Sequence, residues 1–184
     1  MKIEYKERKL SEQERQQVWE ILCQCDEEFY PPLSARNSSA QKQLAAADGE
    51  LVKKSEKPTE YFKEMIRQDF ILAYDDNDQV TGFMTFKRDY ICEALEAFGR
   101  SLYVTTICVR DAYRGQNILG QMYRYLEQEA TGICGCNRVS TRTWSLNHAH
   151  IHGLRRRGYE TLCVLKNHRG PGVDTIYYGL ICDR

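Results

Sequence analysis

The sequence predicts an α/β domain in which helices pack over a mixed β-sheet. Three observations lead to this fold class. The chain has 184 residues, a length that suits a single domain over residues 1–184. Its apolar patterns follow the order β, α, α, β, β, β, α, β, α, β, β, and such an alternation is typical of a mixed sheet covered by helices. We find no internal repeat or low-complexity tail that would favour a solenoid or a disordered region.

The first third of the chain should fold as a strand and a helix followed by irregular structure. Ile3 to Arg8 alternates between apolar and polar residues, as a half-exposed strand does. Ser11, with Glu14 three residues later, forms a capping box for the next helix, which should fade before Pro31-Pro32. Residues 31–57 have weak periodicity, so we expect a loop with a loose helix there.

The middle of the chain should form a short helix and three neighbouring strands. Aromatic and β-branched residues are concentrated in the expected strands, and turn-forming residues separate them. We expect a helix over 58–67, a strand over 70–74, a turn at 76–78, a hairpin arm over 80–90, a link over 93–99 and a strand over 102–109.

The last third should add two helices and three strands. We expect a helix after Gly120 that ends at Gly132, a strand over 138–144, a short helix that follows Asn147 and closes at Gly158, and strands over 159–166 and 174–182 around a turn at 167–172. Tyr177 and Tyr178 should point to opposite faces of the sheet, so that only one of them can line a site.

Charge and hydropathy exclude several classes of partner. Lys and Arg together number 26 and so do Asp and Glu, so no net charge attracts the chain to nucleic acid or to an anionic membrane. No apolar stretch is long enough for a membrane helix, and the first residues do not resemble a signal peptide. We therefore expect a cytoplasmic protein with no nucleic-acid or membrane partner.

The eight cysteines are expected to be reduced. Their share of the chain is well below the roughly 8–10% that indicates a disulfide scaffold. The two C-x-C pairs, at residues 23/25 and 134/136, are more closely spaced than the ligands of ordinary zinc sites. Four others lie in apolar, strand-like runs, where a thiol behaves as a small hydrophobe: Cys92, Cys108, Cys163 and Cys182.

A cluster of three histidines also suggests a metal site. His148 and His152 are four residues apart and share one face of the expected helix, with His150 between them. The sequence places no third ligand or carboxylate on the face that His148 and His152 share, so we expect no metal. Arg155 to Arg157 should be a solvated helix end, or alternatively contact a ribose phosphate of a cofactor.

The most informative stretch runs from Ile107 to Gly120. An expected strand leads into a tight turn that contains Arg114-Gly115, and a helix begins at once. Unpaired backbone N–H groups and the positive end of the helix dipole converge there, which favours a bound phosphate. An ordinary strand-to-helix turn with one exposed arginine is the alternative. Neither the P-loop sequence nor the G-x-G-x-x-G dinucleotide fingerprint is present.

This stretch resembles the phosphate loop of the GNAT superfamily, the Gcn5-related N-acetyltransferases. In that family a strand ending in Val is followed by a short loop and by Arg-Gly-x-Gly-x-Gly/Ala at the start of a helix; here Val109 precedes Arg114-Gly115-Gln116-Asn117-Ile118-Leu119-Gly120. Asn117 takes the place of the second glycine, and Asn is the best substitute for Gly in a left-handed conformation. Leu119 stands where the family has Gly or Ala, with Gly120 one place later.

A second motif strengthens the resemblance. The family has an Asn, a short helix and a Gly-Phe pair that starts the next strand; here these are Asn147, residues 148–157 and Gly158-Tyr159. With the order of elements, the resemblance covers the chain from about Lys2 to Cys182. It implies a mixed, mostly antiparallel central sheet of about seven strands with helices on both faces.

The resemblance also implies a chemistry. It indicates acetyl-CoA as the donor and a primary amine as the acceptor, with direct attack of the amine on the thioester in a ternary complex. Its diphosphate would bind the backbone amides of the loop, and its pantetheine arm would lie along the preceding strand. The residues implied in cofactor binding are Ile107, Cys108, Val109, Arg114, Gly115, Gln116, Asn117, Ile118, Leu119, Gly120 and Asn147.

The catalytic groups are less clearly indicated. Many relatives carry a base carboxylate on the strand that corresponds to residues 102–109, which has none here. Glu93 and Glu96, just upstream, are substitutes, and we take Glu96 as the candidate base; a water relay is the alternative. The tyrosine that often protonates the thiolate would stand seven residues after Asn147, at Leu154.

Histidine is the other candidate acid. His150 or His152 could protonate the thiolate because an imidazole titrates near neutral pH. We take His150 as the candidate.

The acceptor is not identified by the sequence. Acceptor pockets of this fold are built from segments that correspond to residues 26–54 and 167–174, in which the acidic run 26–28 would attract a cationic amine. A GNAT-like module that binds acyl-CoA without turnover is the alternative function, because the carboxylate and the tyrosine are both missing. An RNA-binding module would need clustered basic and aromatic residues, which are absent. Pairing of edge strands would allow a homodimer.

Overall fold

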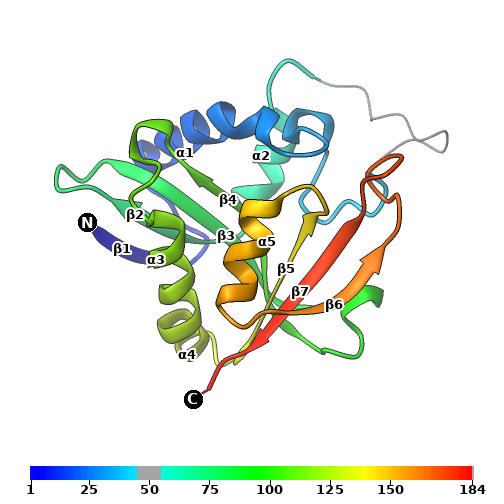
Figure 1. Ribbon diagram of the computed structural model, residues 1–184. Helices are drawn as coiled ribbons and strands as arrows, with labels where there is room; N and C mark the ends of the chain where they lie inside the picture. The colour runs from blue at the N-terminus through cyan, green and yellow to red at the C-terminus, as the bar shows by residue number, and fades with distance from the viewer. Residues whose placement is uncertain (45–54, 184) are drawn as a thin grey trace.

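The computed structural model describes residues 1–44 and 55–183. Seven strands form one sheet in the order β1-β2-β3-β4-β5-β7-β6 (Figure 1). The strands are β1 (Lys2–Lys6), β2 (Asp69–Tyr74), β3 (Val80–Tyr90), β4 (Ser101–Val109), β5 (Arg138–Trp144), β6 (Glu160–Leu165) and β7 (Thr175–Ile181). The helices are α1 (Glu12–Cys25), α2 (Thr59–Met65), α3 (Ile118–Tyr125), α4 (Thr131–Ile133) and α5 (His148–Arg156), with a π-helical segment (Leu126–Ala130) between α3 and α4.

The sheet is mixed, as the sequence predicts. β4 and β5 run parallel, and every other neighbouring pair of strands is antiparallel. Because a parallel pair needs a crossover, the chain between β4 and β5 returns through α3, the π-helical segment and α4, which lie across the sheet in Figure 1. The predicted fold class is confirmed.

Helices cover both faces of the sheet. On one face, α3 and α5 pack their apolar sides on a cluster that includes Met84, Met122 and Leu154. On the other face, α1 and α2 bury Leu22 and Tyr61 against β2 and β3. Tyr178 belongs to the first cluster and Tyr177 to a third cluster with Leu95 and Tyr103, so the prediction that these two tyrosines face opposite ways is confirmed.

The strand β4 contains a bulge at Thr105. Thr85 of β3 pairs with Thr106, and the next residue, Phe86, pairs with Val104, so that Thr105 is the extra residue. An extra residue reverses the alternation of side chains. Leu102 and Val104 therefore face the α3 side of the sheet before the bulge, and Ile107 and Val109 face the same side after it.

The sheet opens at the same point. β4 and β5 pair only from Leu102↔Val139 to Val104↔Thr141, and from there to their carboxyl ends the two strands are not paired. The edges of both strands beyond Val104 and Thr141 are thus left without a neighbouring strand. This opening positions the site described below.

The residues at the helix ends show which predicted helix boundaries are correct and which are wrong. The capping box is confirmed: Ser11 Oγ accepts from the N–H of Glu14, and the Glu14 carboxylate accepts from the N–H of Ser11. The predicted stop at Gly132 is wrong, because α4 continues to Ile133 and the left-handed glycine that follows is Gly135, at φ 65°.

The predicted loose helix of residues 31–57 falls partly outside the described residues, which exclude 45–54. In the part that is described, the regular structure is a 3₁₀ turn over Leu33–Ala35. No helix of the described chain is both long and apolar enough to cross a membrane.

Candidate active site

A cavity of about 720 Å³ lies where β4 and β5 diverge. One wall is the end of β4 from Val104 to Val109, and another is β5 from Thr141 to Trp144. The loop after β4, the start of α5 and the segment that follows α1 complete it. The cavity therefore joins the two motifs that the sequence analysis singles out.

The end of β4 points backbone groups toward this cavity, and one of them, the carbonyl of Val109, already accepts from Arg114 Nε at 3.4 Å and from Cys25 Sγ at 3.9 Å. In an antiparallel pair, the N–H and C=O of alternate residues point toward the partner strand. The N–H of Arg110 donates to Thr81 O on the β3 side, so the backbone polar groups of Val109 and Ile107 point away from β3. That side is the one that β5 has left. The N–H of Val109 thus faces the opening, whereas that of Cys108 faces β3.

The loop between β4 and α3 gathers unpaired amides. Gly115 (φ 77°) and Asn117 (φ 57°) are both left-handed, which turns the chain sharply into α3. No side chain caps α3, and the first helical bond is from Gln121 N–H to Asn117 O. Within the described chain, the six N–H groups of residues 115–120 have no acceptor, whereas the N–H of Arg114 already donates to Asp111 O.

Asn117 and Gly120 fit each other. Asn117 adopts the left-handed conformation that the sequence predicts for it. Its Oδ1 lies 2.1 Å from the position that a Cβ on Gly120 would occupy, so Gly120 leaves the room that the asparagine side chain fills. The carbonyl of Gly120 accepts from Arg157, which also pairs with Glu127 at 2.8 Å.

Arg157 therefore ties the end of α5 to the helix that begins at the loop. Arg155 and Arg156 are exposed, as expected of a solvated helix end.

The side chain of Arg114 turns toward the sheet. It contacts Glu28 at 2.5 Å, Asp111 at 2.7 Å and Cys25 Sγ at 3.7 Å. A hydrogen bond with Cys108 and the nearby Arg114 lower the pKa of Cys25, and burial raises that of Cys108. The acidic run 26–28 is thus not a free cation site: Asp26 is buried and accepts from Ser34 N–H, and Glu28 is paired with Arg114.

Asn147 is the N-cap of α5. Its Oδ1 accepts from His150 N–H at 3.4 Å, and its Nδ2 donates to Thr143 Oγ1 on β5. Both ends of the amide therefore hold α5 against the strand, and Asn147 lines the cavity. Leu154, where the family often has a tyrosine, is fully buried in the core.

His150 lines the cavity in its neutral form. Its Nε2 lies 2.8 Å from the hydroxyl of Tyr123. Burial lowers the pKa of His150 to about 4, so the ring carries no charge at neutral pH. His152 is exposed.

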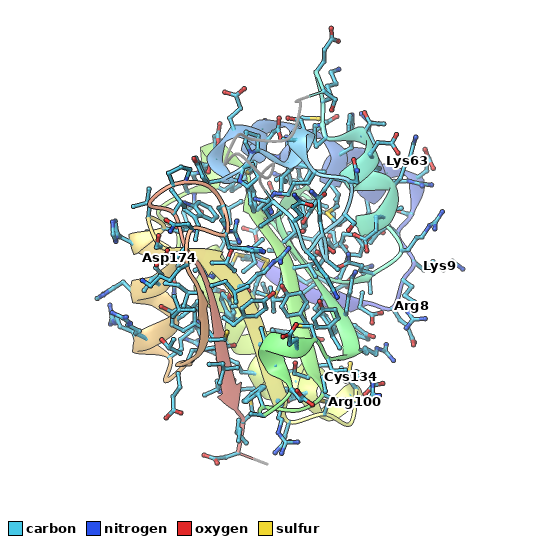
Figure 2. The ribbon with its side chains drawn as sticks, turned by 90° about the vertical axis from the view of Figure 1, so that its right-hand side faces the viewer. Arg8, Lys9, Lys63, Arg100, Cys134 and Asp174 are labelled. Carbon is cyan, nitrogen blue, oxygen red and sulfur yellow. The ribbon has the colours of Figure 1, made fainter. Side chains whose placement is uncertain are left out.

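Glu96 lies outside the cavity. It is exposed and follows a 3₁₀ turn (Glu93–Leu95) that packs against β6. Figure 2 shows Arg100, just after this turn, at the end of the molecule opposite Lys63 of α2. The structure does not bring Glu96 together with the loop, and Glu93 is also exposed. The linker is close to β4 in sequence, but it leads to the amino end of that strand, whereas the cavity lies at the carboxyl end.

The other expected cofactor residues divide into two groups. Those on the cavity wall are Ile107, Cys108, Val109, Arg114, Gly115, Asn117, Ile118, Leu119 and Asn147. Gln116 is exposed and Gly120 is buried, and neither side of the wall includes them.

Three arginines on the cavity wall were not predicted. They are Arg36 after the 3₁₀ turn, Arg142 on β5 and Arg169 in the β6–β7 turn. Arg36 lies over the ring of Phe29, and Arg169 lies over that of Trp144. A signal was present in β5, where Arg142 and Trp144 alternate on one side of a strand that leads to Asn147. Nothing in the sequence indicates that Arg36 or Arg169 would be buried.

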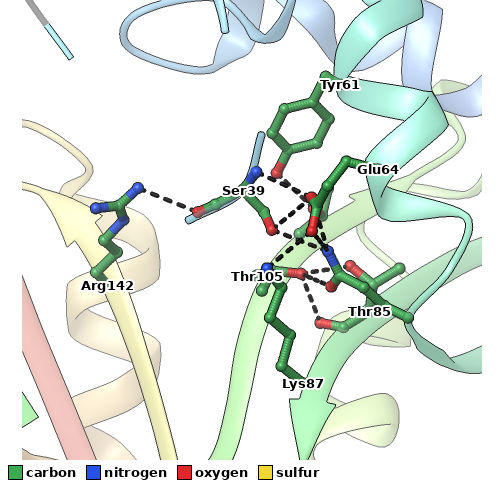
Figure 3. Close-up of polar contacts among 9 residues, drawn as sticks. Ser39, Tyr61, Glu64, Thr85, Lys87, Thr105 and Arg142 are labelled. Atoms are coloured by element: carbon green, nitrogen blue, oxygen red, sulfur yellow. Dashed lines mark hydrogen bonds and ion pairs between the residues drawn. The ribbon is translucent and has the colours of Figure 1, made fainter. Parts of the chain in front are cut away.

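A polar network beneath the cavity links Arg142 to β4 (Figure 3). Arg142 donates to the carbonyl of Ser39, and the Ser39 hydroxyl donates to Glu64 at 2.9 Å. Glu64 also pairs with Lys87 at 2.8 Å, and the bulge residue Thr105 bonds to Gln68 in the same network. Glu64 is a structural carboxylate, since its partners are Ser39, Gln68 and Lys87 and it does not line the cavity.

The described residues contain no group of three or more His, Cys, Asp or Glu side chains that could hold a metal ion. All eight cysteines are free thiols.

Comparison with known proteins defines the class of this site. Residues 16–159 match the family model described as acetyltransferase (GNAT) family. The chain belongs to this family; it is an acetyltransferase whose donor is acetyl-CoA. No match is found among curated proteins.

Solved structures share the fold. An aminoglycoside 6'-N-acetyltransferase from Enterococcus faecium has a TM-score of 0.68 and 15% identity, with 100% of this chain and 98% of that chain covered. A ribosomal-protein-alanine N-acetyltransferase from Brucella melitensis gives 0.63 and 16%, with coverage of 98% and 99%. An aminoglycoside 6'-N-acetyltransferase complexed with coenzyme A gives 0.67 and 16%, with coverage of 100% and 98%. These identities show a common fold alone.

Proposed function

We propose that the chain transfers the acetyl group of acetyl-CoA to a primary amine by direct attack, with both substrates bound at once. One observation carries this proposal. Six unpaired amides at the start of α3 adjoin the open backbone edge of β4, and four of them belong to residues that line the cavity: Gly115, Asn117, Ile118 and Leu119. The amides would bind a diphosphate, and the edge of β4 would bind a chain that contains amide groups.

The residues fit the donor. Amides 115–120 and the N-terminus of α3 would bind the diphosphate without side-chain cations. Space beside Gly115 is open, since a Cβ there would meet nothing within 4 Å. The backbone groups of Ile107 and the N–H of Val109 would pair with the pantetheine arm as an added strand does. The proposed donor site thus consists of the residues expected from the sequence: the loop, Ile107 to Val109 and Asn147.

Acetyl-CoA supplies a thioester; the amine nitrogen bonds to its carbonyl carbon, the carbon–sulfur bond breaks, the amine gives up one proton and the thiolate takes one. The N–H of Val109 faces the opening and would stabilise negative charge on the carbonyl oxygen. Cys25 and Cys108 are not needed as acyl carriers in this reaction, although both line the cavity.

The proton acceptor is the least defined part of the site. Glu28 is the one carboxylate on the wall formed by the described residues, so it replaces Glu96 as our candidate base. A neutral imidazole is a weak acid, so we assign His150 a hydrogen-bonding role and the protonation of the thiolate to water.

Steady-state kinetics test the proposal. With acetyl-CoA and a panel of primary amines, release of the CoA thiol should depend on both substrates and give intersecting initial-rate lines. Cys25→Ala should keep the activity, and Glu28→Gln should lower kcat more than it raises KM. Parallel lines together with an inactive Cys25→Ala variant would instead indicate an acyl-cysteine route and reject direct attack.

A binding module without turnover is the second candidate. It is favoured by the ion pair of Glu28 with Arg114 and by Leu154 in place of the tyrosine. Calorimetric binding of CoA with no transfer to any amine of the panel would support it over the enzyme.

Other expectations stay predictions. These are a single domain over residues 1–184, a cytoplasmic location, an assembly as a homodimer and the absence of a nucleic-acid partner. Eight free thiols are consistent with a reducing compartment.

A further inference from the structure

Three arginines meet at one end of the cavity. Arg169 Nη1 donates to Tyr30 O at 2.5 Å, and Arg36 Nη2 donates to the next carbonyl, Pro31 O, at 2.6 Å. Arg142 Nη2 is held a few residues further along the same segment, by Ser39 O and Gln41 O at 3.1 and 3.0 Å. Carbonyls of one segment, residues 30–41, therefore hold all three guanidinium groups.

Aromatic rings bridge the same groups. The guanidinium of Arg36 lies over Phe29 and that of Arg169 over Trp144, at 5.7 and 5.6 Å from the ring centroids. The two rings are themselves 6.1 Å apart. All five side chains line the cavity, and the rings fix the two arginines in place.

The positive charge of this cluster is not neutralised by any ion pair of the described residues, although the nearby buried carboxylate of Asp26 attracts Arg36. Every hydrogen-bond partner of Arg36, Arg142 and Arg169 is a neutral carbonyl or hydroxyl oxygen, and within residues 1–44 and 55–183 none of them forms an ion pair. Glu28, the wall's carboxylate, is already engaged by Arg114.

Burial makes this arrangement costly. Arg36 is 6% exposed and Arg169 is 2% exposed. Nη1 of Arg36 and Nη2 of Arg169 have no acceptor in the described chain, although both side chains line the cavity. Burial and repulsion by Arg142 lower the pKa of Arg36 to about 10, which leaves it charged at neutral pH. An anion in the cavity would relieve this cost.

The cluster lies away from the donor loop. Residues 30–41 and the β6–β7 turn lie side by side at the upper right of Figure 1, whereas the start of α3 lies on the other side of α5. An anion bound by the arginines would thus belong to the acceptor and not to the donor's diphosphate.

We propose that Arg36, Arg142 and Arg169 bind a carboxylate of the acceptor, so that the substrate is a primary amine that also carries a carboxylate, such as an amino acid. The inference rests on the proposed function. A guanidinium presents paired N–H donors that match the two oxygens of a carboxylate. Trp144 and Phe29 would pack against the carbon skeleton of the acceptor. Polycationic amines would be repelled.

The first test compares acceptors that differ only in charge. With saturating acetyl-CoA, the standard L-amino acids are assayed beside their carboxamides, with spermidine as the polycation. The best acid should exceed its carboxamide in kcat/KM by about 10-fold to 100-fold, the range expected for a charge-assisted hydrogen bond. Carboxamides used as well as acids, or spermidine as the best acceptor, would overturn the inference and leave acetyl transfer intact.

A variant tests the residues. Arg142→Gln should raise KM for the acid about 10-fold or more and bring the acid-to-carboxamide ratio close to 1, with CoA affinity unchanged. Arg138→Gln is the matched control, because Arg138 is exposed at the other end of β5. Equal ratios for the wild type and Arg142→Gln would contradict the proposal.

A binding measurement separates the two proposals. The melting temperature of the CoA-saturated chain is measured with N-acetyl amino acids and with their carboxamides. Stabilisation by the acids alone, lost in Arg142→Gln, would support the anion site. If the acids stabilise the chain but no amine is acetylated, the proposed function is rejected and the anion site is kept. No difference between acids and carboxamides would reject the anion site.

Discussion

Asn117 shows how one residue sets the geometry of the phosphate loop. At φ 57° it stands in a conformation that glycine adopts freely and asparagine tolerates, and it starts α3 without a side-chain cap. The amides that follow it have no acceptor in the described chain, and Ile118 and Leu119 line the cavity. Asn117 therefore adopts the left-handed conformation expected at the position of the family's second glycine.

Substitution of Asn117 should separate conformation from side-chain chemistry. Asn117→Gly should change the free energy of unfolding by less than about 0.5 kcal/mol and preserve CoA affinity, whereas Asn117→Ala should cost about 1 kcal/mol and weaken CoA several-fold, because alanine resists the left-handed region. Urea denaturation and calorimetry measure both effects. Equal CoA affinities for the two variants would contradict this account of the loop.

His150 should titrate well below the usual range of histidine. Burial lowers its pKa to about 4, so between pH 6.5 and 4 the unfolded chain binds a proton that the folded chain does not. The free energy of unfolding should therefore decrease by about 1–2 kcal/mol as the pH is lowered from 6.5 to 4. The decrease should be smaller in His150→Gln. NMR titration of the imidazole checks the pKa directly.

The helix α1 illustrates a local signal that the fold reinforces. The capping box is written in the sequence, but Glu14 also accepts from Tyr74 at 2.5 Å and pairs with Lys6 at 2.9 Å. The helix start is thereby attached to β1 and β2. Desolvation opposes ionisation of Glu14, yet these hydrogen bonds lower its pKa to about 2.

Removal of this charge should make the molecule less stable. Because the folded pKa is depressed, the contribution of Glu14 is complete above about pH 4.5 and is lost as pH falls toward 2. Glu14→Gln should cost about 1–2 kcal/mol at pH 7 and little at pH 2. Glu12→Gln, an exposed substitution in the same helical turn, is the control and should cost less than about 0.5 kcal/mol. A loss for Glu14→Gln that did not vary with pH would contradict the mechanism.

At the level of elements, β4 decides the site. Its nine residues read as an ordinary strand, but the bulge at Thr105 reverses the side-chain alternation, and β5 parts from it at Val104. The bulge is held by the bonds of Thr105 to Thr85 and Gln68. The alternation of residues in β4 does not indicate where pairing with β5 ends. The opening between the two strands therefore cannot be predicted from the sequence.

For the whole molecule, donor binding should be visible as stability. CoA at 100 times its dissociation constant should stabilise the fold by about 2.7 kcal/mol, which raises the melting temperature by about 5–10 °C for a chain of this size. Pantetheine at the same concentration should give a much smaller shift, because it lacks the diphosphate that amides 115–120 would bind. Equal shifts for the two ligands would argue against the loop as the phosphate site.

The sequence by itself determined the class of fold, the order of the strands and helices, the capping box and the two motifs around residues 114–120 and Asn147. These are local: turns, caps and apolar periods depend on residues within a few positions of one another. Tertiary structure alone decided that Glu96 lies outside the cavity and that Arg36, Arg142 and Arg169 meet inside it. Side chains separated by 27 to 133 positions come together only through the sheet order and the turn that packs on it, and charge burial depends on that packing.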